Sequence, residues 1–237
     1  MIRNLLLDLD DTILDFHRAE KIALTRALTE AGVEVTDARL ARYSEINNSR
    51  WQLLEEKKIT RPEVLLSRFE IFFRELGIDV DAHAVEQTYE RYLSVGHFFL
   101  PGAEKLLETL FPRYRLYLAS NGSASVQAGR IASAGIAKYF REMCISETIG
   151  ADKPDPAFFR YVFSKIPDFK EEETIMLGDS LTSDIRGGCG VGIRTVWYNP
   201  KHKPARADIH PTYEIDDLSL FSPLIERIST EDDNKNK

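Results

Sequence analysis

The sequence IRNLLLDLDDT (residues 2–12) decides how the rest of the chain is interpreted. Its apolar run from Ile2 to Leu9 predicts a β-strand that ends in a cluster of acids. Because side chains alternate along a strand, Asp8 and Asp10 are expected to project to the same side. Two such carboxylates suit a nucleophile toward phosphorus and a group that acts first as an acid and then as a base. An acidic strand end that simply turns into a solvated loop is the alternative.

Apolar runs of similar length recur downstream and predict strands at residues 115–119, 143–146, 174–178 and 195–198. Helical patterns lie between these runs or follow them, at residues 102–110, 123–134, 156–166, 182–189 and after residues 216–217. Strands that alternate with helices are typical of a parallel, doubly wound sheet. We therefore predict the α/β class, with a Rossmann-like core.

The segment from His17 to Gly96 breaks this alternation. It reads as successive helices at residues 19–31, 37–57, 62–76 and 81–95, and Thr60 and Glu63 have the spacing of a capping box. We predict a helical cap domain at residues 16–96, inserted into a core domain formed by residues 1–15 and 97–237. An insert directly after the first strand would lie over the carboxyl ends of the parallel strands, where such sheets bind ligands.

Two further polar motifs follow predicted strands. The sequence GDSLTSD (residues 178–184) brings Asp179 and Asp184 to the end of one strand, where they could face Asp8, although such residues also cap helices well. Ser120 and Asn121 close another strand just before a helix, whose N–H groups and dipole favour a phosphate. Ser120 and Asn121 would fit equally well in an ordinary turn with no role in binding.

Lys153 and the charge balance complete the pattern. Pro154 restricts the backbone of Lys153 to extended conformations, although a loop lysine is usually solvated. If Asp8, Asp10 and Asp179 converge, a phosphate dianion meets about 4 kcal/mol of repulsion per charge pair at contact, for an effective dielectric constant of about 20. One lysine cannot offset that repulsion. A divalent cation can, and ligands that are all oxygen favour magnesium (Mg2+).

Taken together and in this order, the motifs resemble those of the haloacid dehalogenase (HAD) superfamily of phosphatases. The resemblance covers the whole core: DLDDT at residues 8–12, Ser120 with Asn121, Lys153-Pro154, and residues 178–184. The helical insert is similar to the type 1 cap of that superfamily. The set of motifs is highly specific, whereas each motif alone is not.

The resemblance implies a role for each residue. Asp8 would form an aspartyl-phosphate and also bind magnesium through its carboxylate. Asp10 would be the acid and base and would offer its backbone carbonyl to the metal. Asp179 would be the other protein ligand of magnesium, and Asp184 would support the ligands from behind. The phosphoryl oxygens would be held by Ser120, Asn121 and Lys153.

Within the superfamily, the cap is similar to that of bacterial house-cleaning pyrimidine 5′-nucleotidases. The likeness rests on Asn47 and Trp51 in one predicted helix, Ile59-Thr60 before the next, and Arg68-Phe69 inside it. Core residues 145–147 and 197–199 add to it. Trp51 and Phe69 are interpreted either as apolar core of the cap or as platforms that stack on a base. The predicted function is a magnesium-dependent phosphomonoester hydrolase, with a pyrimidine nucleoside 5′-monophosphate as substrate.

Other functions share parts of this pattern. A phosphosugar phosphatase or a phosphosugar mutase would use the same core, although no second phosphate site is evident in the cap. A dehalogenase is disfavoured because displacing a halogen from carbon needs neither Asp10 nor the metal-binding acids. A non-catalytic interaction protein of the same fold is disfavoured because the acids and Lys153 are all present.

The composition excludes several other classes of protein. The formal net charge of the 237 residues is -7 and there is no long block of Lys or Arg, which disfavours nucleic acids and anionic membranes as partners. Cys144 and Cys189 lack metal-ligand spacing and fit a reducing compartment. The apolar run at the start is too short for a signal peptide, so we expect a cytoplasmic protein. The oligomeric state cannot be read from the sequence.

Overall fold

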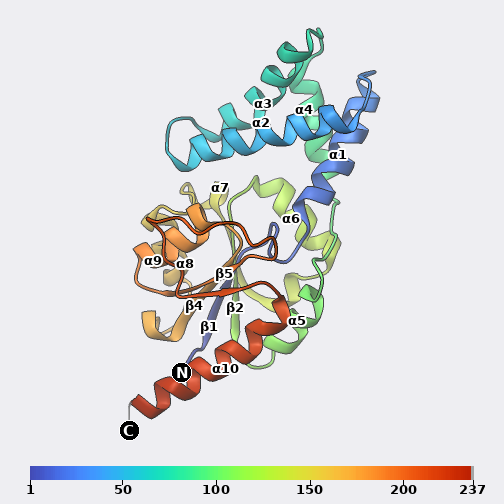
Figure 1. Ribbon diagram of the computed structural model, residues 1–237. Helices are drawn as coiled ribbons and strands as arrows, with labels where there is room; N and C mark the ends of the chain where they lie inside the picture. Colours follow the sequence, from blue (N-terminus) through green and yellow to red (C-terminus); the bar gives the residue numbers. More distant parts are fainter. Residues whose placement is uncertain (236–237) are drawn as a thin grey trace.

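The computed structural model describes residues 1–235 and contains one six-stranded parallel sheet (Figure 1). The strands are β1 (Asn4–Leu7), β2 (Arg115–Ser120), β3 (Phe140–Ile145), β4 (Thr174–Gly178), β5 (Arg194–Tyr198) and β6 (Tyr213–Ile215). Their order is β3-β2-β1-β4-β5-β6, and every neighbouring pair is parallel. The predicted α/β class with a doubly wound parallel sheet is confirmed. The sequence reasoning missed β6, which has only three residues.

Helices cover both faces of the sheet. Leu5 and Leu7 of β1 belong to an apolar core shared with α5 (Ala103–Leu110), α6 (Ala124–Ala134) and α10 (Phe221–Lys235). Leu6, which points the other way, packs in a second core with α8 (Pro156–Ser164). Fully burying each of these leucines contributes roughly 1.5–3 kcal/mol. The shorter elements are η1 (Ala137–Tyr139), α7 (Ser146–Ile149), η2 (Glu171–Glu173), η3 (Leu181–Ile185), α9 (Arg186–Gly190) and η4 (Leu218–Leu220).

Four helices form the insert that follows β1, here called the cap: α1 (Phe16–Glu30), α2 (Asp37–Glu55), α3 (Arg61–Leu76) and α4 (Ala82–Leu93). They lie beyond one end of the sheet, away from both chain termini (Figure 1). The cap has its own apolar core, in which Tyr43, Phe69 and Tyr89 are fully buried. The predicted capping box is present, since the Glu63 carboxylate accepts a hydrogen bond from the Thr60 N–H at 2.7 Å.

The connections between cap and core fall near the predicted domain boundaries. The first helix of the cap begins at Phe16, and the last one ends at Leu93. The division at residues 15/16 and 96/97 stays a prediction. Among residues 1–235, no helix combines the length and the apolar character that crossing a membrane requires.

The turn after β1 differs from the predicted strand end. β1 ends at Leu7, so the alternation expected to carry Asp8 and Asp10 to one side does not extend to Asp10. Asp10 instead bridges to Leu14, and Asp11 adopts a positive φ of 56°. The chain therefore bends back on itself, and the carboxylates of Asp8 and Asp10 take different directions.

The carboxyl end of β4 needs a glycine. A Cβ placed on Gly178 would lie 2.1 Å from Oδ2 of Asp184, which is fully buried against the strand end. Because Asp184 sits in η3, just after β4 along the chain, the missing side chain of Gly178 lets η3 pack directly against β4.

We expect Gly178→Ala to lower the free energy of unfolding by about 1–3 kcal/mol, the usual cost of overpacking. Gly190→Ala is the matched control, because a Cβ there meets nothing within 4 Å. This control should change stability by less than about 1 kcal/mol, and in the stabilising direction. Urea unfolding measures both variants. Equal urea midpoints for Gly178→Ala and the wild type would contradict the packing argument.

Candidate active site

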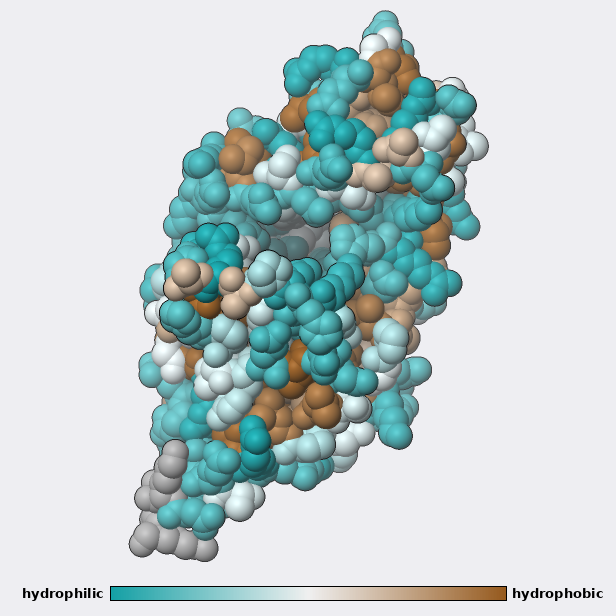
Figure 2. Space-filling model, in the orientation of Figure 1, coloured by the Kyte–Doolittle hydropathy of each residue, from teal (hydrophilic) through white to brown (hydrophobic). Residues whose placement is uncertain are grey.

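A cavity of about 230 Å³ lies where the carboxyl ends of the strands face the cap. The surface is hollowed between the upper, helical part of the molecule and the part that holds the sheet (Figure 2). From the core, the cavity is lined by Asp8, Asp10, Asn121, Lys153 and Asp179, among others. These five residues and Asp184 are six of the seven site residues predicted from sequence, so the structure brings all but Ser120 to one cavity.

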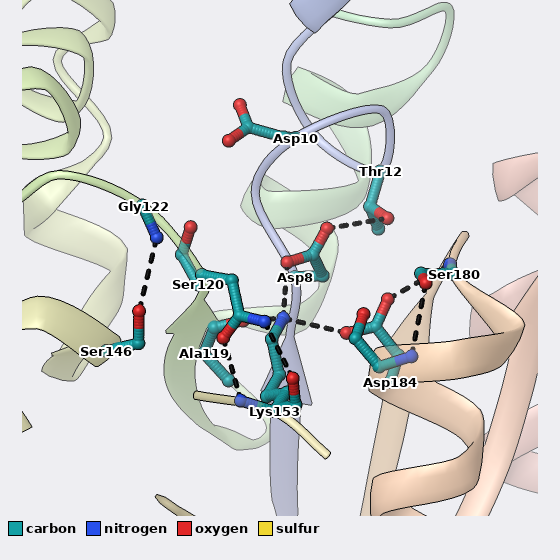
Figure 3. Close-up of polar contacts among 12 residues, drawn as sticks. Asp8, Asp10, Thr12, Ala119, Ser120, Gly122, Ser146, Lys153, Ser180 and Asp184 are labelled. Carbon is teal, nitrogen blue, oxygen red and sulfur yellow. Dashed lines mark hydrogen bonds and ion pairs between the residues drawn. The ribbon is translucent and has the colours of Figure 1, made fainter. Parts of the chain in front are cut away.

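Lys153 is the centre of the buried polar contacts in the core. Its Nζ donates to Oδ1 of Asp8 at 2.6 Å, to Oδ1 of Asp184 at 2.7 Å and to the Ala119 carbonyl at 2.5 Å (Figure 3). These three acceptors match the three N–H donors of an ammonium group. The Lys153 side chain is only 1% exposed. The buried ammonium group of Lys153 therefore fixes the direction of the Asp8 carboxylate.

Asn121 holds the backbone of Lys153. The Asn121 side-chain oxygen accepts from the Lys153 N–H at 2.8 Å, and its side-chain N–H group donates to the Lys153 carbonyl at 2.8 Å. Burial lowers the pKa of Lys153, but the Asp184 and Asp8 carboxylates outweigh burial and raise it above its ordinary value. The group at position 153 is therefore a fixed cation.

Three carboxylates gather beside this cation. Asp8, Asp179 and Asp184 each offer an oxygen, and these oxygens all lie within 4.8 Å of one another. Burial raises the pKa of Asp8 well above its ordinary value, Lys153 opposes that rise, and Asp184 adds to it. Burial, with the neighbouring Asp184 and Asp11, raises the pKa of Asp179 to about 8. Negative charge is thus in excess at this point.

The donor set fits a magnesium ion. Seven acidic but only three basic side chains line the cavity, so a dianionic substrate would meet a net negative wall. Buried carboxylates are expensive unless a cation or a hydrogen bond compensates them. Oxygen ligands at this spacing are the type that magnesium prefers. Asp8, Asp179 and Asp184 bring oxygens close enough together to hold such an ion. The assignment of Asp8, Asp10 and Asp179 as ligands, with Asp184 behind them, stays a prediction.

Neighbouring residues orient these acids. The Trp197 ring N–H donates to the backbone carbonyl of Asp179 at 2.9 Å, and the Lys203 ammonium lies 3.4 Å from Oδ2 of Asp179. Oδ2 of Asp184 accepts from the Ser180 N–H at 3.1 Å. These contacts fix the directions of the Asp179 and Asp184 carboxylates at the edge of the cavity.

Asp10 has a separate set of partners. Its Oδ1 lies 2.5 Å from Nη1 of Arg130, and its Oδ2 accepts from Nε2 of Gln127 at 2.6 Å. The carboxylate of Asp10 points away from the pair formed by Asp8 and Lys153 (Figure 3). Sequence reasoning missed Gln127 and Arg130. Their i,i+3 spacing on the helix after Ser120 was the available signal, because it places both side chains on one helix face.

The two residues predicted to bind phosphate at the end of β2 are placed differently. Asn121 lines the cavity. The Ser120 hydroxyl is buried and accepts from Nε2 of Gln127 at 2.9 Å, and Ser120 is not among the residues that line the cavity. The N–H of Gly122, which lines the cavity, donates to the Ser146 hydroxyl at 3.3 Å. The roles assigned to Ser120, Asn121 and Lys153 in holding phosphoryl oxygens stay predictions.

The cap supplies the opposite wall. Asn47, Trp51 and Arg68 line the cavity, as does Phe16 at the start of α1. Phe69 does not line it, because its ring is fully buried among Tyr43, Phe73 and Tyr89. Of the two interpretations offered for the aromatic residues, Phe69 therefore takes the first, as apolar core of the cap. Trp51 lines the cavity, and the guanidinium carbon of Arg61 lies 5.4 Å from the centroid of its ring.

Comparison with known proteins agrees with this geometry. A family model of haloacid dehalogenase-like hydrolases matches residues 2–192. The chain is 41% identical to the HAD-hydrolase YfnB of Bacillus subtilis over 213 residues, which is 90% of this chain and 91% of YfnB. It is 42% identical to the pyrimidine 5'-nucleotidase PynA of Streptococcus pneumoniae, over 89% of this chain and 90% of PynA.

Two further relatives complete the comparison. The pyrimidine 5'-nucleotidase YjjG of Escherichia coli is 26% identical over 92% of this chain and 95% of YjjG. A crystal structure of Bacillus subtilis YfnB bound to magnesium, described as revealing interdomain movement, superposes with a TM-score of 0.90 at 40% identity, covering 94% of this chain and 98% of that one. On the family match and the relatives above 40% identity, this chain belongs to the haloacid dehalogenase-like hydrolases.

Proposed function

We propose that this hydrolase is a magnesium-dependent phosphatase of small phosphomonoesters, with pyrimidine nucleoside 5′-monophosphates as substrates. The observation that carries the proposal is the buried Asp8, held by Lys153, beside the oxygens of Asp179 and Asp184 at one end of the cavity. A carboxylate fixed in this way is a competent nucleophile toward phosphorus. The surrounding acids are the reason why a magnesium ion is proposed as the cofactor.

The proposed reaction has two steps. A carboxylate oxygen of Asp8 attacks phosphorus, so an O–P bond to Asp8 forms while the bond to the leaving oxygen breaks. Protonated Asp10 donates its proton to that leaving oxygen. Water then attacks the phosphorus of the aspartyl-phosphate, Asp10 takes a proton from the water, and the bond to Asp8 breaks. Inorganic phosphate leaves, and both aspartates return to their starting states.

The chain prepares this reaction before substrate arrives. Lys153 favours the ionised, attacking form of Asp8, since its Nζ lies 2.6 Å from Oδ1 and offsets part of the rise in the pKa of Asp8 that burial causes. Asp8 and Asp179 would hold the magnesium, with the backbone carbonyl of Asp10 as a further proposed ligand. Asp184, whose Oδ1 accepts from Lys153 at 2.7 Å, would support these ligands from behind. When bound, magnesium would offset the negative charge of the acids and of the transferring phosphoryl group.

The cap wall favours a small leaving group with a planar base. The cavity of about 230 Å³ lies below the usual size range of ligand pockets, which favours the smaller pyrimidine over the larger purine. Trp51 and Leu65 offer apolar surface, and Arg68 and Glu90 offer a donor and an acceptor for the polar edge of a base. The names of PynA and YjjG support the same substrate class.

The cap is also proposed to move relative to the core. The magnesium-bound crystal structure of YfnB is described as revealing such interdomain movement in that protein. In this chain, the Lys57 ammonium lies 2.6 Å from Oδ2 of Asp155, and Arg61 contacts Asp152 and Ser146. These contacts join the cap to the core on one side of the cavity, so opening the cap would have to break them.

We expect the purified protein to release phosphate from UMP or dTMP when magnesium is present. Phosphate release should stop when EDTA removes the metal. Asp8→Asn should abolish turnover, because an amide is not a nucleophile toward phosphorus. Asp10→Asn should slow turnover at least ~10²–10⁴-fold, the usual contribution of acid–base catalysis. Phosphate release and thermal melts measure these effects.

Asp15→Asn is the matched control for these two variants. Asp15 lies in the same loop, caps α1 by accepting from the Arg18 N–H at 2.8 Å, and does not line the cavity. Asparagine caps helices as well as aspartate does, so this variant should keep wild-type turnover. Wild-type protein that hydrolyses no nucleotide or sugar phosphate, with or without magnesium, would refute the proposed function.

A second prediction concerns the base. Trp51→Ala should lower kcat/KM for UMP by about 5- to 150-fold, which corresponds to the roughly 1–3 kcal/mol that stacking on an aromatic ring contributes. The variant should hydrolyse acetyl phosphate, which has no base, at the wild-type rate. Tyr92→Ala in α4 is the control, because Tyr92 is a cap aromatic residue that does not line the cavity. Equal losses for UMP and acetyl phosphate would indicate cap damage rather than base recognition.

A further inference from the structure

Arg130 of α6 is a fully buried cation that contacts Asp10 and two segments near the cap. Its side chain is 0% exposed. Nη1 lies 2.5 Å from Oδ1 of Asp10, and Nε donates to the backbone carbonyl of Gly96 at 3.0 Å. The guanidinium carbon lies 5.5 Å from the ring centroid of Phe16. One side chain thus contacts three separate segments of the chain.

Those three segments have distinct places in the fold. Asp10 is the proposed acid and base. Phe16 is the first residue of α1, where the chain enters the cap, and Gly96 lies in the segment that returns from α4 to the core. Arg130 is therefore in contact with the proton-transfer group and with both connections between cap and core.

The returning connection, residues 94–97, packs closely against α6 and α1. The Ser133 hydroxyl donates to the Val95 carbonyl at 3.2 Å, and a Cβ on Gly129 would lie 2.7 Å from the Ser94 carbonyl oxygen. A Cβ on Gly96 would lie 2.8 Å from Cβ of Ala19 in α1. The connection therefore lies directly against both helices at these glycines, and a rotation of the cap about it is expected to shift the Gly96 carbonyl relative to α6.

Arg130 cannot easily release Asp10 when that happens. Among residues 1–235, Asp10 is the only carboxylate in an ion pair with Arg130, and Nη2 of Arg130 is buried without a hydrogen-bond partner. Because the Arg130 guanidinium is fully buried, losing its contact with Asp10 would leave its charge uncompensated, which is strongly unfavourable. A shift of the guanidinium is therefore expected to carry the Asp10 carboxylate with it.

We propose that Arg130 couples the direction of the Asp10 carboxylate to the connection between cap and core, so that proton transfer depends on the position of the cap. The inference rests on the proposed phosphatase function, because it assigns Arg130 a positioning role toward the acid and base of that reaction. Nε2 of Gln127 donates to the other oxygen of Asp10 at 2.6 Å and so restricts the rotation of the carboxylate.

The second step of the reaction reports on Asp10 directly. With p-nitrophenyl phosphate, the leaving oxygen needs little help from an acid, so Asp8 can still be phosphorylated when Asp10 is misplaced. Hydrolysis of the aspartyl-phosphate still requires Asp10 to take a proton from water. A misplaced Asp10 should therefore produce a burst of p-nitrophenolate, about one per active site, followed by slow turnover.

Three variants test the coupling by stopped-flow measurement of that burst with magnesium present. Arg130→Met removes the guanidinium, and Gly96→Ala displaces the connection without touching Asp10. Both should enlarge the burst relative to the wild type and slow the steady state about 10- to 100-fold, as expected for a misplaced catalytic group. Ser133→Ala is the control, because Ser133 contacts the same connection but not Asp10, and it should behave as wild type.

The possible results test the proposed function, the positioning role of Arg130 and the coupling to the connection separately. A wild-type protein that forms no phosphoenzyme and no p-nitrophenolate overturns the proposed function, and the coupling with it. Normal dephosphorylation in Arg130→Met, in an active wild-type background, overturns the positioning role alone. If Arg130→Met does not fold, as thermal melts would show, Gly96→Ala decides the question. Wild-type burst and turnover in Gly96→Ala would refute the coupling to the connection.

Discussion

The arrangement of the site depends on one buried ammonium group, that of Lys153. It bonds to Asp8 after β1, to the Ala119 carbonyl in β2 and to Asp184 after β4, so it ties together the ends of three neighbouring strands. Without this cation, two buried carboxylates would face each other uncompensated, a loss that costs about 3–5 kcal/mol in comparable buried pairs. The direction of the proposed nucleophile is therefore set by charge pairing as well as by the sheet.

The sheet explains why this much could be predicted from the sequence. The apolar runs fixed the first five strands, and parallel strands bring their carboxyl ends to the same edge. Because β1 lies between β2 and β4, the residues that follow these strands must be neighbours, whatever their distance along the chain. The convergence of Asp8, Asn121 and Asp179 follows from this order, which the structure supplies. Lys153 comes after β3 and α7, so its place was expected from the resemblance rather than from the strands.

The features that escaped prediction depend on side-chain pairing between elements. Gln127 and Arg130 read in the sequence as polar positions of a surface helix, which normally face solvent. Both are buried here because α6 packs under the connections to the cap. The direction of Asp10 was missed for a related reason, since periodicity gives no sign that β1 ends at Leu7 and that the chain then bends. A three-residue strand such as β6 is too short to leave a periodic signal.

The buried polar side chains of the cap form a hydrogen-bonded network of their own, separate from the contacts of Arg130 at the connections. Asn47 donates to Oε1 of Glu20 at 2.8 Å and accepts from Nη1 of Arg68 at 3.1 Å, and all three side chains are buried. Such a network is stable only when its members are paired, so it fixes the Arg68 guanidinium before any ligand arrives. Recognition in the cap and nucleophilic attack in the core would thus rest on preorganised groups. If Arg130 acts as proposed, proton transfer is the one function tied to the connections between the two, which makes cap position a natural control over the reaction.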